Sequence, residues 1–344
     1  MRWTFALKHA IVLATLGLVP VLALVACEKQ PSGTASQSAL RIGAVLPLTG
    51  DAAAYGESAR KGIDLALEQI TASRAADAPK ITVVYEDSQG SPTKAVSALR
   101  KLITADKVPA VIGDLLSSNT LAMAPVANEN KVVLLSPASS APAITNSGEY
   151  IFRNCPSDTL QGSLMADYAR DRLKLDTVGI IYVNNDYGIG IRAVFTKAFT
   201  QNGGKIVADE AYPQDASNFR SQLAKIKGAN PQAVYLIGYR EVGTLLKQAT
   251  ELGLRTRYFS TILFEDPQIL EIGGAATEGV VYTALAYDTK QSDPVVQAFV
   301  KAYRERHHSD PDIFAALSYD ALKILAACAD TSSTADQIKA QLYA

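Results

Sequence analysis

Two pairs of serine hydroxyls each follow a short apolar run with the composition of a buried β-strand. Ser117 and Ser118 stand immediately before a helical pattern, and Ser139 and Ser140 follow the next apolar run along the chain. Hydroxyls and free backbone N–H groups at a helix N-terminus can bind a carboxylate. Because open α/β sheets bind ligands at the carboxyl ends of their strands, the two pairs together predict a carboxylate site. The alternative is that these serines only cap helices.

No set of residues has the spacing of a common catalytic or nucleotide-binding motif. The sequence contains no Gly-x-Ser-x-Gly, no His-Glu-x-x-His and no Gly-x-x-x-x-Gly-Lys-Ser/Thr. His307 and His308 are neighbours on a predicted helix, where their side chains point about 100° apart and cannot serve one site; we expect both to be solvated. The sequence therefore favours a binding protein over an enzyme, with no cofactor and no metal, and an exported hydrolase is kept as an alternative.

The serine pairs must be positioned by a parallel sheet, because the chain beyond residue 40 alternates short β-branched runs with amphipathic stretches. The predicted strands are 41–46, 81–86, 110–113 and 132–136 in a first set and 178–183, 206–211, 233–237, 258–262 and 279–283 in a second. Apolar residues recur with helical spacing from Ile63, and the helical run 242–252 stops at Gly253. The pattern predicts an α/β protein of two doubly wound parallel-sheet units.

Two segments without periodicity are expected to carry the chain between these units. The first is 152–159, which contains Pro156, and the second lies near 284–288. The expected boundaries are 40–157 with 286–344 for lobe 1, and 158–285 for lobe 2.

The composition is that of a globular protein, with 48% apolar and 19% charged residues in a chain of 344. Its 33 basic and 34 acidic residues give a net charge of −1, so nucleic acid is not an expected partner. The cysteines Cys27, Cys155 and Cys328 share no short spacing, which excludes a zinc ribbon and a Cys-x-x-Cys redox pair. We expect Cys155 and Cys328 to be free thiols, with a disulfide formed after export as the alternative.

The first 26 residues have the pattern of an export signal. They contain two basic residues, no carboxylate, and an apolar stretch over 10–26 that is short for a bilayer span. This stretch ends in Leu-Val-Ala before Cys27, which resembles the bacterial lipobox, whose cysteine is lipidated and becomes the first mature residue. Residues 27–39 are rich in Ser, Gln, Gly and Thr and predict a flexible tether. We expect an exported, periplasmic or extracytoplasmic protein anchored to a membrane through Cys27; the alternatives are an ordinary signal cut nearby and an uncleaved anchor.

A series of short segments carries a family resemblance. These segments are Ile42-Gly43 to Pro47-Leu48-Thr49-Gly50, Tyr55-Gly56-Glu57, Glu86-Asp87-Ser88-Gln89-Gly90, Ile112-Gly113 with Ser117-Ser118, Leu135-Ser136-Pro137, Phe152-Arg153-Asn154-Cys155-Pro156-Ser157-Asp158, Asp186-Tyr187-Gly188 and Glu278-Gly279-Val280. In this order and spacing they resemble the solute-binding proteins of ABC importers of the leucine/isoleucine/valine-binding type. That resemblance implies the type I periplasmic binding fold, in which two lobes joined by a hinge close on a ligand.

The resemblance also implies a function and its partners. The closed protein would present its small-molecule ligand to the permease subunits of an ABC importer, whose separate ATPase subunits supply the energy. The implied solute is a branched-chain or other aliphatic amino acid. The alternatives are an aromatic carboxylate, an amide or urea taken up in the same way, and a protein of the same fold that senses a ligand for signalling.

Several residues match ligand-binding positions of this family. Ser117 and Ser140 correspond to the side chains that hold the ligand carboxylate, and the Ala138 carbonyl corresponds to an acceptor for its ammonium group. Tyrosines that wall the ligand correspond to Tyr55, Tyr187 and Tyr239. The alternative for a tyrosine at a strand end is half-buried packing with a solvated hydroxyl.

An acidic residue of the second lobe is expected to face the ligand ammonium. Glu265 falls near the family position of this acid. The surrounding segment 263–267 departs from the family pattern, so Asp266 is an alternative for the acid or is a helix N-cap.

The C-terminal end is expected to be incomplete. Family members continue past the helix that corresponds to 336–342 into a Gly-rich stretch and a short Phe-Asp-containing strand that returns to the second lobe. No such strand pattern follows Cys328 before the sequence ends at Ala344. The alternative is a naturally short member whose second lobe is completed differently.

Overall fold

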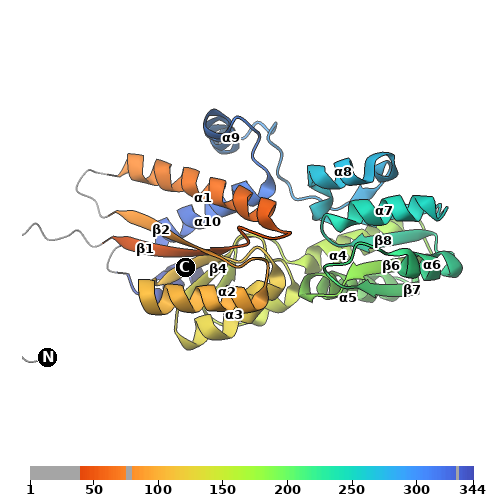
Figure 1. The fold of residues 1–344 in the computed structure, drawn as a ribbon, viewed down its shortest axis with the longest axis horizontal. Coiled ribbons are helices and arrows are strands. Elements are labelled where there is room, and N and C mark those ends of the chain that lie inside the picture. Colours follow the sequence, from red (N-terminus) through yellow and green to blue (C-terminus); the bar gives the residue numbers. More distant parts are fainter. Residues whose placement is uncertain (1–38, 75–79, 331–332) are drawn as a thin grey trace, which may run out of the picture. The chain divides into compact units, whose positions relative to one another are not determined.

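The computed structural model describes residues 39–74, 80–330 and 333–344. The predicted signal, Cys27 and the tether up to residue 38 lie outside the described residues. Two five-stranded sheets, parallel throughout, are flanked by helices, which confirms the predicted α/β fold (Figure 1). Within the described part of the chain, no helix has the length and apolar character needed to cross a bilayer.

The first sheet has the strand order β2-β1-β3-β4-β5. Its strands are β1 Leu40–Leu46, β2 Ile81–Asp87, β3 Ala110–Gly113, β4 Val133–Ser136 and β5 Ile151–Arg153. Side chains alternate between the two faces, so that Ile42 and Ala44 join one buried cluster and Val45 joins another. Because both faces are covered, these strands are near-continuous apolar runs, which is why the sequence pattern located them.

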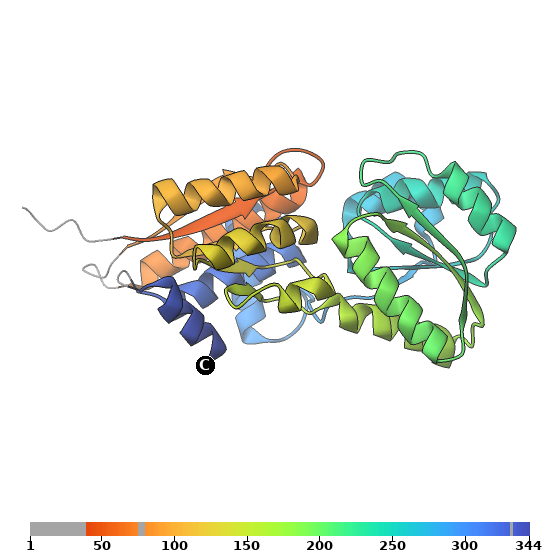
Figure 2. The same ribbon diagram turned by 90° about the horizontal axis from the view of Figure 1, so that it is seen from below.

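Helices from both ends of the chain cover this sheet. One face carries α1 Ala53–Ser73, α9 Pro294–His307, α10 Ile313–Cys328 and α11 Ala335–Tyr343, and the other carries α2 Pro92–Lys101 and α3 Ser117–Glu129 (Figure 1). The C-terminal helix α11, dark blue in Figure 2, lies beside this sheet and buries Ile338 in the same cluster as Ile42.

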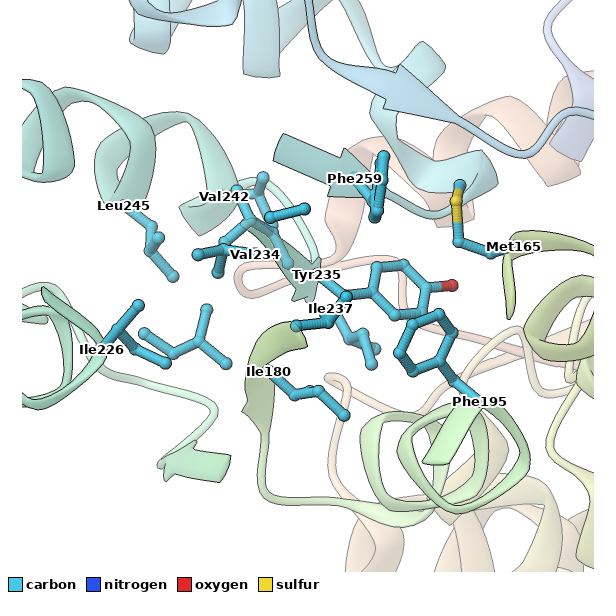
Figure 3. Packing of buried hydrophobic residues seen from close by; sticks show 14 of the residues in the cluster. Met165, Ile180, Phe195, Ile226, Val234, Tyr235, Ile237, Val242, Leu245 and Phe259 are labelled. Carbon is cyan, nitrogen blue, oxygen red and sulfur yellow. The ribbon is translucent and has the colours of Figure 1, made fainter. Parts of the chain in front are cut away.

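The second sheet has the order β10-β9-β8-β6-β7. Its strands are β6 Thr177–Val183, β7 Lys205–Tyr212, β8 Ala233–Ile237, β9 Arg257–Ser260 and β10 Val281–Tyr282, and its helices are α4 Asp158–Asp167, α5 Asp186–Gln201, α6 Arg220–Ala229, α7 Glu241–Glu251 and α8 Pro267–Gly273. Alternation along β8 points Tyr235 toward Phe195 and Met165, and Val234 toward Leu245 (Figure 3). The ring centroids of Phe195 and Tyr235 are 4.8 Å apart.

Short one-turn segments complete the described chain. They are η1 Leu102–Asp106, η2 Pro142–Asn146, η3 Tyr168–Arg172, η4 Ile262–Glu265 and η5 Gly274–Thr277. Every predicted strand is present, with ends that differ by at most two residues. Strand β5 was not predicted, because residues 152 and 153 were assigned to the first connecting segment, 152–159. Three residues are too few to show a period, and Pro156 follows closely.

The chain passes from the first sheet to the second through residues 154–157, between β5 and α4. It passes back through residues 283–293, between β10 and α9. Because both sheets are parallel, the loops that follow their strands gather at the carboxyl edge of each sheet.

Gly62 provides a test of the packing of α1 on α10. A Cβ at Gly62 would stand 2.1 Å from the Ala315 backbone oxygen, so Gly62→Ala must push the two helices apart. We expect the free energy of unfolding, measured by urea denaturation, to fall by about 1–3 kcal/mol. Gly228→Ala in α6 is the matched control, since a Cβ there meets nothing within 4 Å. This control should leave stability unchanged or raise it by up to about 1 kcal/mol, and a loss as large as that of Gly62→Ala would contradict the packing argument.

Candidate functional site

A largely apolar cavity is lined by strand-end loops and helices of both sheets and by the two connecting segments. Its lining residues are Tyr55, Leu115, Leu116, Ser117, Ala138, Ser140, Ile313, Phe314 and Leu317 from around the first sheet, Asp158, Leu160, Gln161, Leu164, Tyr187, Tyr239, Ile262 and Leu263 from around the second, and Cys155, Pro156, Ser157, Thr283, Ala284 and Leu285 from the connections. Among the predicted ligand-binding residues, Tyr55, Ser117, Ala138, Ser140, Tyr187 and Tyr239 line this cavity, whereas Ser118, Ser139 and Glu265 do not.

Ser117 is the first residue of α3, directly after the loop that follows β3. Leu116 is the N-cap and makes no side-chain cap, so the serine does not act as the cap of this helix. The Ser117 Oγ accepts a hydrogen bond from the Ala141 backbone N at 3.2 Å. Because this bond uses a lone pair and leaves the hydroxyl proton available, Ser117 can donate into the cavity.

Ser140 lies on the neighbouring loop, after β4, and hydrogen bonds join it to Asp158 at the start of α4. Its Oγ donates to Oδ2 of Asp158 at 2.9 Å, and its backbone oxygen accepts from the Asp158 backbone N at 2.9 Å. This pair of bonds holds the loop after β4 against the connection that leads to the second sheet.

The other two predicted serines lie outside the cavity. Ser139 is fully buried, and its Oγ donates to the Asp114 backbone oxygen at 2.9 Å and lies 2.8 Å from Thr120 Oγ1. Ser118 Oγ accepts a hydrogen bond from the Asp186 backbone N at 3.2 Å, linking the starts of α3 and α5. Ser139 therefore holds two strand-end loops together, and Ser118 connects helices of the two sheets.

Three tyrosines form an aromatic part of the wall. Tyr187 and Tyr239 stack with ring centroids 5.3 Å apart, and the Tyr187 hydroxyl donates to Thr261 Oγ1 at 2.8 Å. Tyr55 packs on Phe314 with centroids 4.7 Å apart. Burial raises the pKa of Tyr187 and Tyr239 above the usual range. These hydroxyls therefore stay neutral at physiological pH.

Glu265 stands at the end of η4 and is exposed to solvent. From the same segment it is Ile262 and Leu263 that line the cavity. The structure thus places two apolar side chains in the wall and leaves the carboxylate of Glu265 outside it. A role for Glu265 at the ammonium group stays a prediction.

Asp266 is the N-cap of α8 and accepts a hydrogen bond from the Gln268 backbone N at 2.9 Å, which is the alternative considered for it. It also forms an ion pair with Arg240, whose Nε lies 2.8 Å from Oδ2. The guanidinium carbon of Arg240 lies 4.5 Å from the ring centroid of Tyr55. This cation–π contact joins a loop of the second sheet to α1 of the first.

Asp158 is the carboxylate of the cavity wall, and no role was predicted for it from the sequence. It is 1% exposed, and its Oδ1 accepts from Gln161 Nε2 at 2.8 Å. Burial raises the pKa of Asp158 to about 6, while the hydrogen bonds from Ser140 and Gln161 and the charge of Arg153 act to lower it. In the sequence, Ser157 followed by Asp158 has the ordinary pattern of an N-cap and the first turn of a helix, where acidic side chains are usually solvated. No local signal therefore marks Asp158 as buried.

Other predicted features can also be located. Cys155 and Cys328 are both free, as expected. His307 is half-buried with its ring 4.5 Å from that of Tyr303, so the prediction that it is solvated was wrong, whereas His308 is exposed as predicted. No cluster of three or more metal-ligating side chains occurs among residues 39–74, 80–330 and 333–344.

The chain is similar to proteins whose names refer to branched-chain amino acids. It is 29% identical over 302 residues to the leucine-, isoleucine-, valine-, threonine- and alanine-binding protein of Pseudomonas aeruginosa, covering 87% of this chain and 80% of that protein. The structure of a leucine-binding protein, LivK, from Thermotoga maritima superposes with a TM-score of 0.81 at 30% identity, covering 88% of this chain and 87% of the other.

A second solved structure has a different kind of ligand. The solute-binding protein of an ABC transporter from Rhodopseudomonas palustris, in complex with benzoate, superposes with a TM-score of 0.78 at 25% identity, covering 88% of this chain and 84% of that one. The family model described as periplasmic binding protein matches residues 39–344. With its two parallel sheets and a cavity lined from both, the chain belongs to the periplasmic binding protein family.

Proposed function

We propose that this protein is the solute-binding component of an ABC importer and that it captures a branched-chain or other aliphatic amino acid. The observation that carries the proposal is the cavity itself, in which the Ser117 hydroxyl and the start of α3 are enclosed by apolar walls from both sheets. The names of the relatives from P. aeruginosa and T. maritima support the same class of solute.

The groups of an amino acid can be assigned to parts of this cavity. The carboxylate is held by the Ser117 hydroxyl and the positive end of the α3 dipole. The Ala138 carbonyl is the acceptor for the ammonium group. The aliphatic side chain packs among the apolar lining residues, which include Leu116, Phe314 and Leu317. Burying such a side chain contributes about 1.5–3 kcal/mol.

Capture depends on two lobes, for which we propose the limits 40–157 with 286–344 and 158–285. The connecting segments 154–157 and 283–293 then form the hinge. A solute that touches the walls of both lobes favours the closed form, because only that form offers all the contacts. The closed form would be presented to permease subunits in the membrane.

An aromatic carboxylate is the second candidate solute. Two observations favour it: Glu265 is not among the residues that line the cavity, and the R. palustris protein was solved with benzoate.

The proposal has two further parts. The protein binds its solute without chemical turnover, and it is exported and carries a lipid anchor on Cys27.

The ligand class is tested by thermal unfolding of the protein with leucine, isoleucine, valine or benzoate. A ligand at about 100 times its dissociation constant stabilises the folded state by about 2.7 kcal/mol, so the melting temperature should rise by several degrees with one or more of the amino acids. A rise with benzoate alone would instead select the second candidate, and a rise with none of the four would contradict both.

Ser117→Ala tests the carboxylate position, with Ser139→Ala as the matched control. Loss of a charge-assisted hydrogen bond from Ser117 should weaken leucine binding, measured by calorimetry, by about 10- to 100-fold. Ser139→Ala should retain the affinity and lower the free energy of unfolding by about 1–3 kcal/mol, because Ser139 holds buried loops. Equal affinities of Ser117→Ala and the unmodified protein would contradict the assignment.

Cys27→Ser tests the anchor. If the thiol of Cys27 carries the lipid, the full-length protein should sediment with membranes and Cys27→Ser should not be lipidated, as read from its mass. The same lipid-free mass for both proteins would reject the anchor and leave the solute-binding proposal intact.

A further inference from the structure

A chain of hydrogen bonds leads from the backbone of η4 to the Ser140 hydroxyl. The Ile262 backbone N donates to Oε1 of Gln161 at 2.8 Å, and Thr283 Oγ1 donates to the same oxygen. Gln161 Nε2 then donates to Oδ1 of Asp158 at 2.8 Å. Ser140 Oγ donates to the other carboxylate oxygen, Oδ2, at 2.9 Å.

The backbone N–H of Ile262 sets the orientation of Gln161, and the ionised state of Asp158 sets the direction of the bond to Ser140. A backbone N–H can only donate, so the carboxamide oxygen of Gln161 must face Ile262 and its NH₂ group must face Asp158. The ionised Asp158 carboxylate has no proton to donate, so it accepts from Gln161 and also accepts the single proton of the Ser140 hydroxyl. Towards the cavity, Ser140 Oγ is left with lone pairs only.

The two cavity serines consequently have opposite polarity. Ser117 Oγ accepts from the Ala141 backbone N and keeps its proton for the cavity, whereas Ser140 has given its proton to Asp158. A donor and an acceptor on neighbouring loops match the carboxylate and the ammonium group of one α-amino acid. This polarity differs from the role that the family resemblance implied for Ser140, which was to hold the carboxylate.

We propose that Asp158 and Gln161 are specificity-determining positioning residues, which fix Ser140 as a hydrogen-bond acceptor and thereby make the site select a solute with a primary ammonium group. The proposal rests on the proposed function and names the group of the solute that is recognised. Asp158 is also the only carboxylate among the lining residues, and no lysine, arginine or histidine side chain lines the described cavity. The electrostatic field of the wall therefore favours a cation near Ser140.

Protonation of Asp158 would reverse the polarity of Ser140. The groups that face this carboxyl are Arg153 on β5, Cys155 on the connecting segment, Tyr187 on α5, and Tyr235 and Tyr239 on and after β8. Arg153 is the charged one among them. A proton on Oδ2 would be donated to Ser140 Oγ, and the Ser140 hydroxyl would then turn its own proton to the cavity. Since burial raises the pKa of Asp158 to about 6, this reversal falls between pH 7.5 and pH 5.

Asp158→Asn imitates the protonated carboxyl, because its amide can accept from Gln161 and donate to Ser140. Two probes are compared by calorimetry at pH 7.5: leucine, and 4-methylpentanoate, which has the same skeleton without the amino group. The unmodified protein should prefer leucine. Asp158→Asn should weaken leucine binding by at least tenfold and leave 4-methylpentanoate unchanged or bound more tightly.

A matched control lies on the same helix. Asp167 is exposed near the end of α4 and lies outside the cavity, so Asp167→Asn should bind both probes as the unmodified protein does. The empty Asp158→Asn protein should be at least as stable at pH 7.5. A raised pKa means that the ionised carboxyl costs stability above its folded pKa, and the neutral amide avoids this cost.

Gln161→Glu and pH give independent readouts. A carboxylate at position 161 can still accept from Ile262, but it repels the charge of Asp158 and raises the pKa of Asp158 further. For the unmodified protein, leucine affinity should fall as the pH drops through about 6, by up to tenfold per pH unit below it. For Gln161→Glu, the same fall should begin at a higher pH.

The outcomes separate this inference from the proposed function. If the unmodified protein binds leucine but Asp158→Asn weakens both probes by the same factor, the inference is overturned and solute capture stands. Tighter binding of 4-methylpentanoate than of leucine by the unmodified protein also overturns it. Failure of the unmodified protein to bind leucine, isoleucine or valine refutes the amino-acid function and the inference with it. If Asp158→Asn does not fold, a leucine affinity that is constant from pH 7.5 to 5 overturns the inference.

Discussion

Every strand pair in the described part of the chain is parallel, and the site depends on this constraint. Parallel strands end at the same edge of their sheet, so the loops after β3 and β4 leave that edge as neighbours. The serines on these loops are far apart from the residues of the second sheet in sequence, yet Ser117, Ser140, Tyr187 and Tyr239 line one cavity. The apolar strand interiors supply the rigidity that keeps these loops in place.

A parallel edge leaves polar loops partly enclosed, and their polar groups need partners. The Asp114 backbone oxygen accepts hydrogen bonds from Ser136 and Ser139, and the Asp114 carboxylate accepts from Leu116 N and Asn119. This network uses Ser136 and Ser139 of the loop after β4 for structure and leaves Ser140 for the cavity. On the loop after β3, Ser118 bonds to the start of α5 and Ser117 lines the cavity. Serines that look equivalent in sequence therefore differ in role, because only one orientation of each loop satisfies the buried groups.

The connection between the sheets extends this polar network to the second sheet. Gln161 accepts from Ile262 and donates to Asp158, so that groups from three separate segments meet beside Ser140. A buried carboxylate is costly unless its oxygens accept hydrogen bonds. Gln161 and Ser140 are the two donors to Asp158. Because Ser140 gives its proton to this bond, the lone pairs of its Oγ are left for the cavity. The same hydrogen bonds therefore stabilise the buried charge of Asp158 and set the polarity of Ser140.

The sequence by itself determined the fold class, the strands other than β5 and several residues of the cavity wall. Strand interiors such as Ile112 and Leu236 are buried on both faces, so a local apolar run was sufficient to identify them. The family resemblance predicted that Tyr55, Tyr187 and Tyr239 wall one ligand, and all three line the cavity. The short strand β5 was missed, since three residues carry no period.

Only the tertiary structure decided which side chains face the cavity and with what polarity. Ser139 and Ser140 are adjacent, but one is buried among loops of the first sheet and the other meets α4, a distinction that depends on partners distant in sequence. From the segment of η4 it is Ile262 and Leu263 that line the cavity, whereas Glu265 does not. Asp158 has the local pattern of a solvated helix start. Its burial comes from packing against segments remote in the chain, and local sequence contains no record of such contacts.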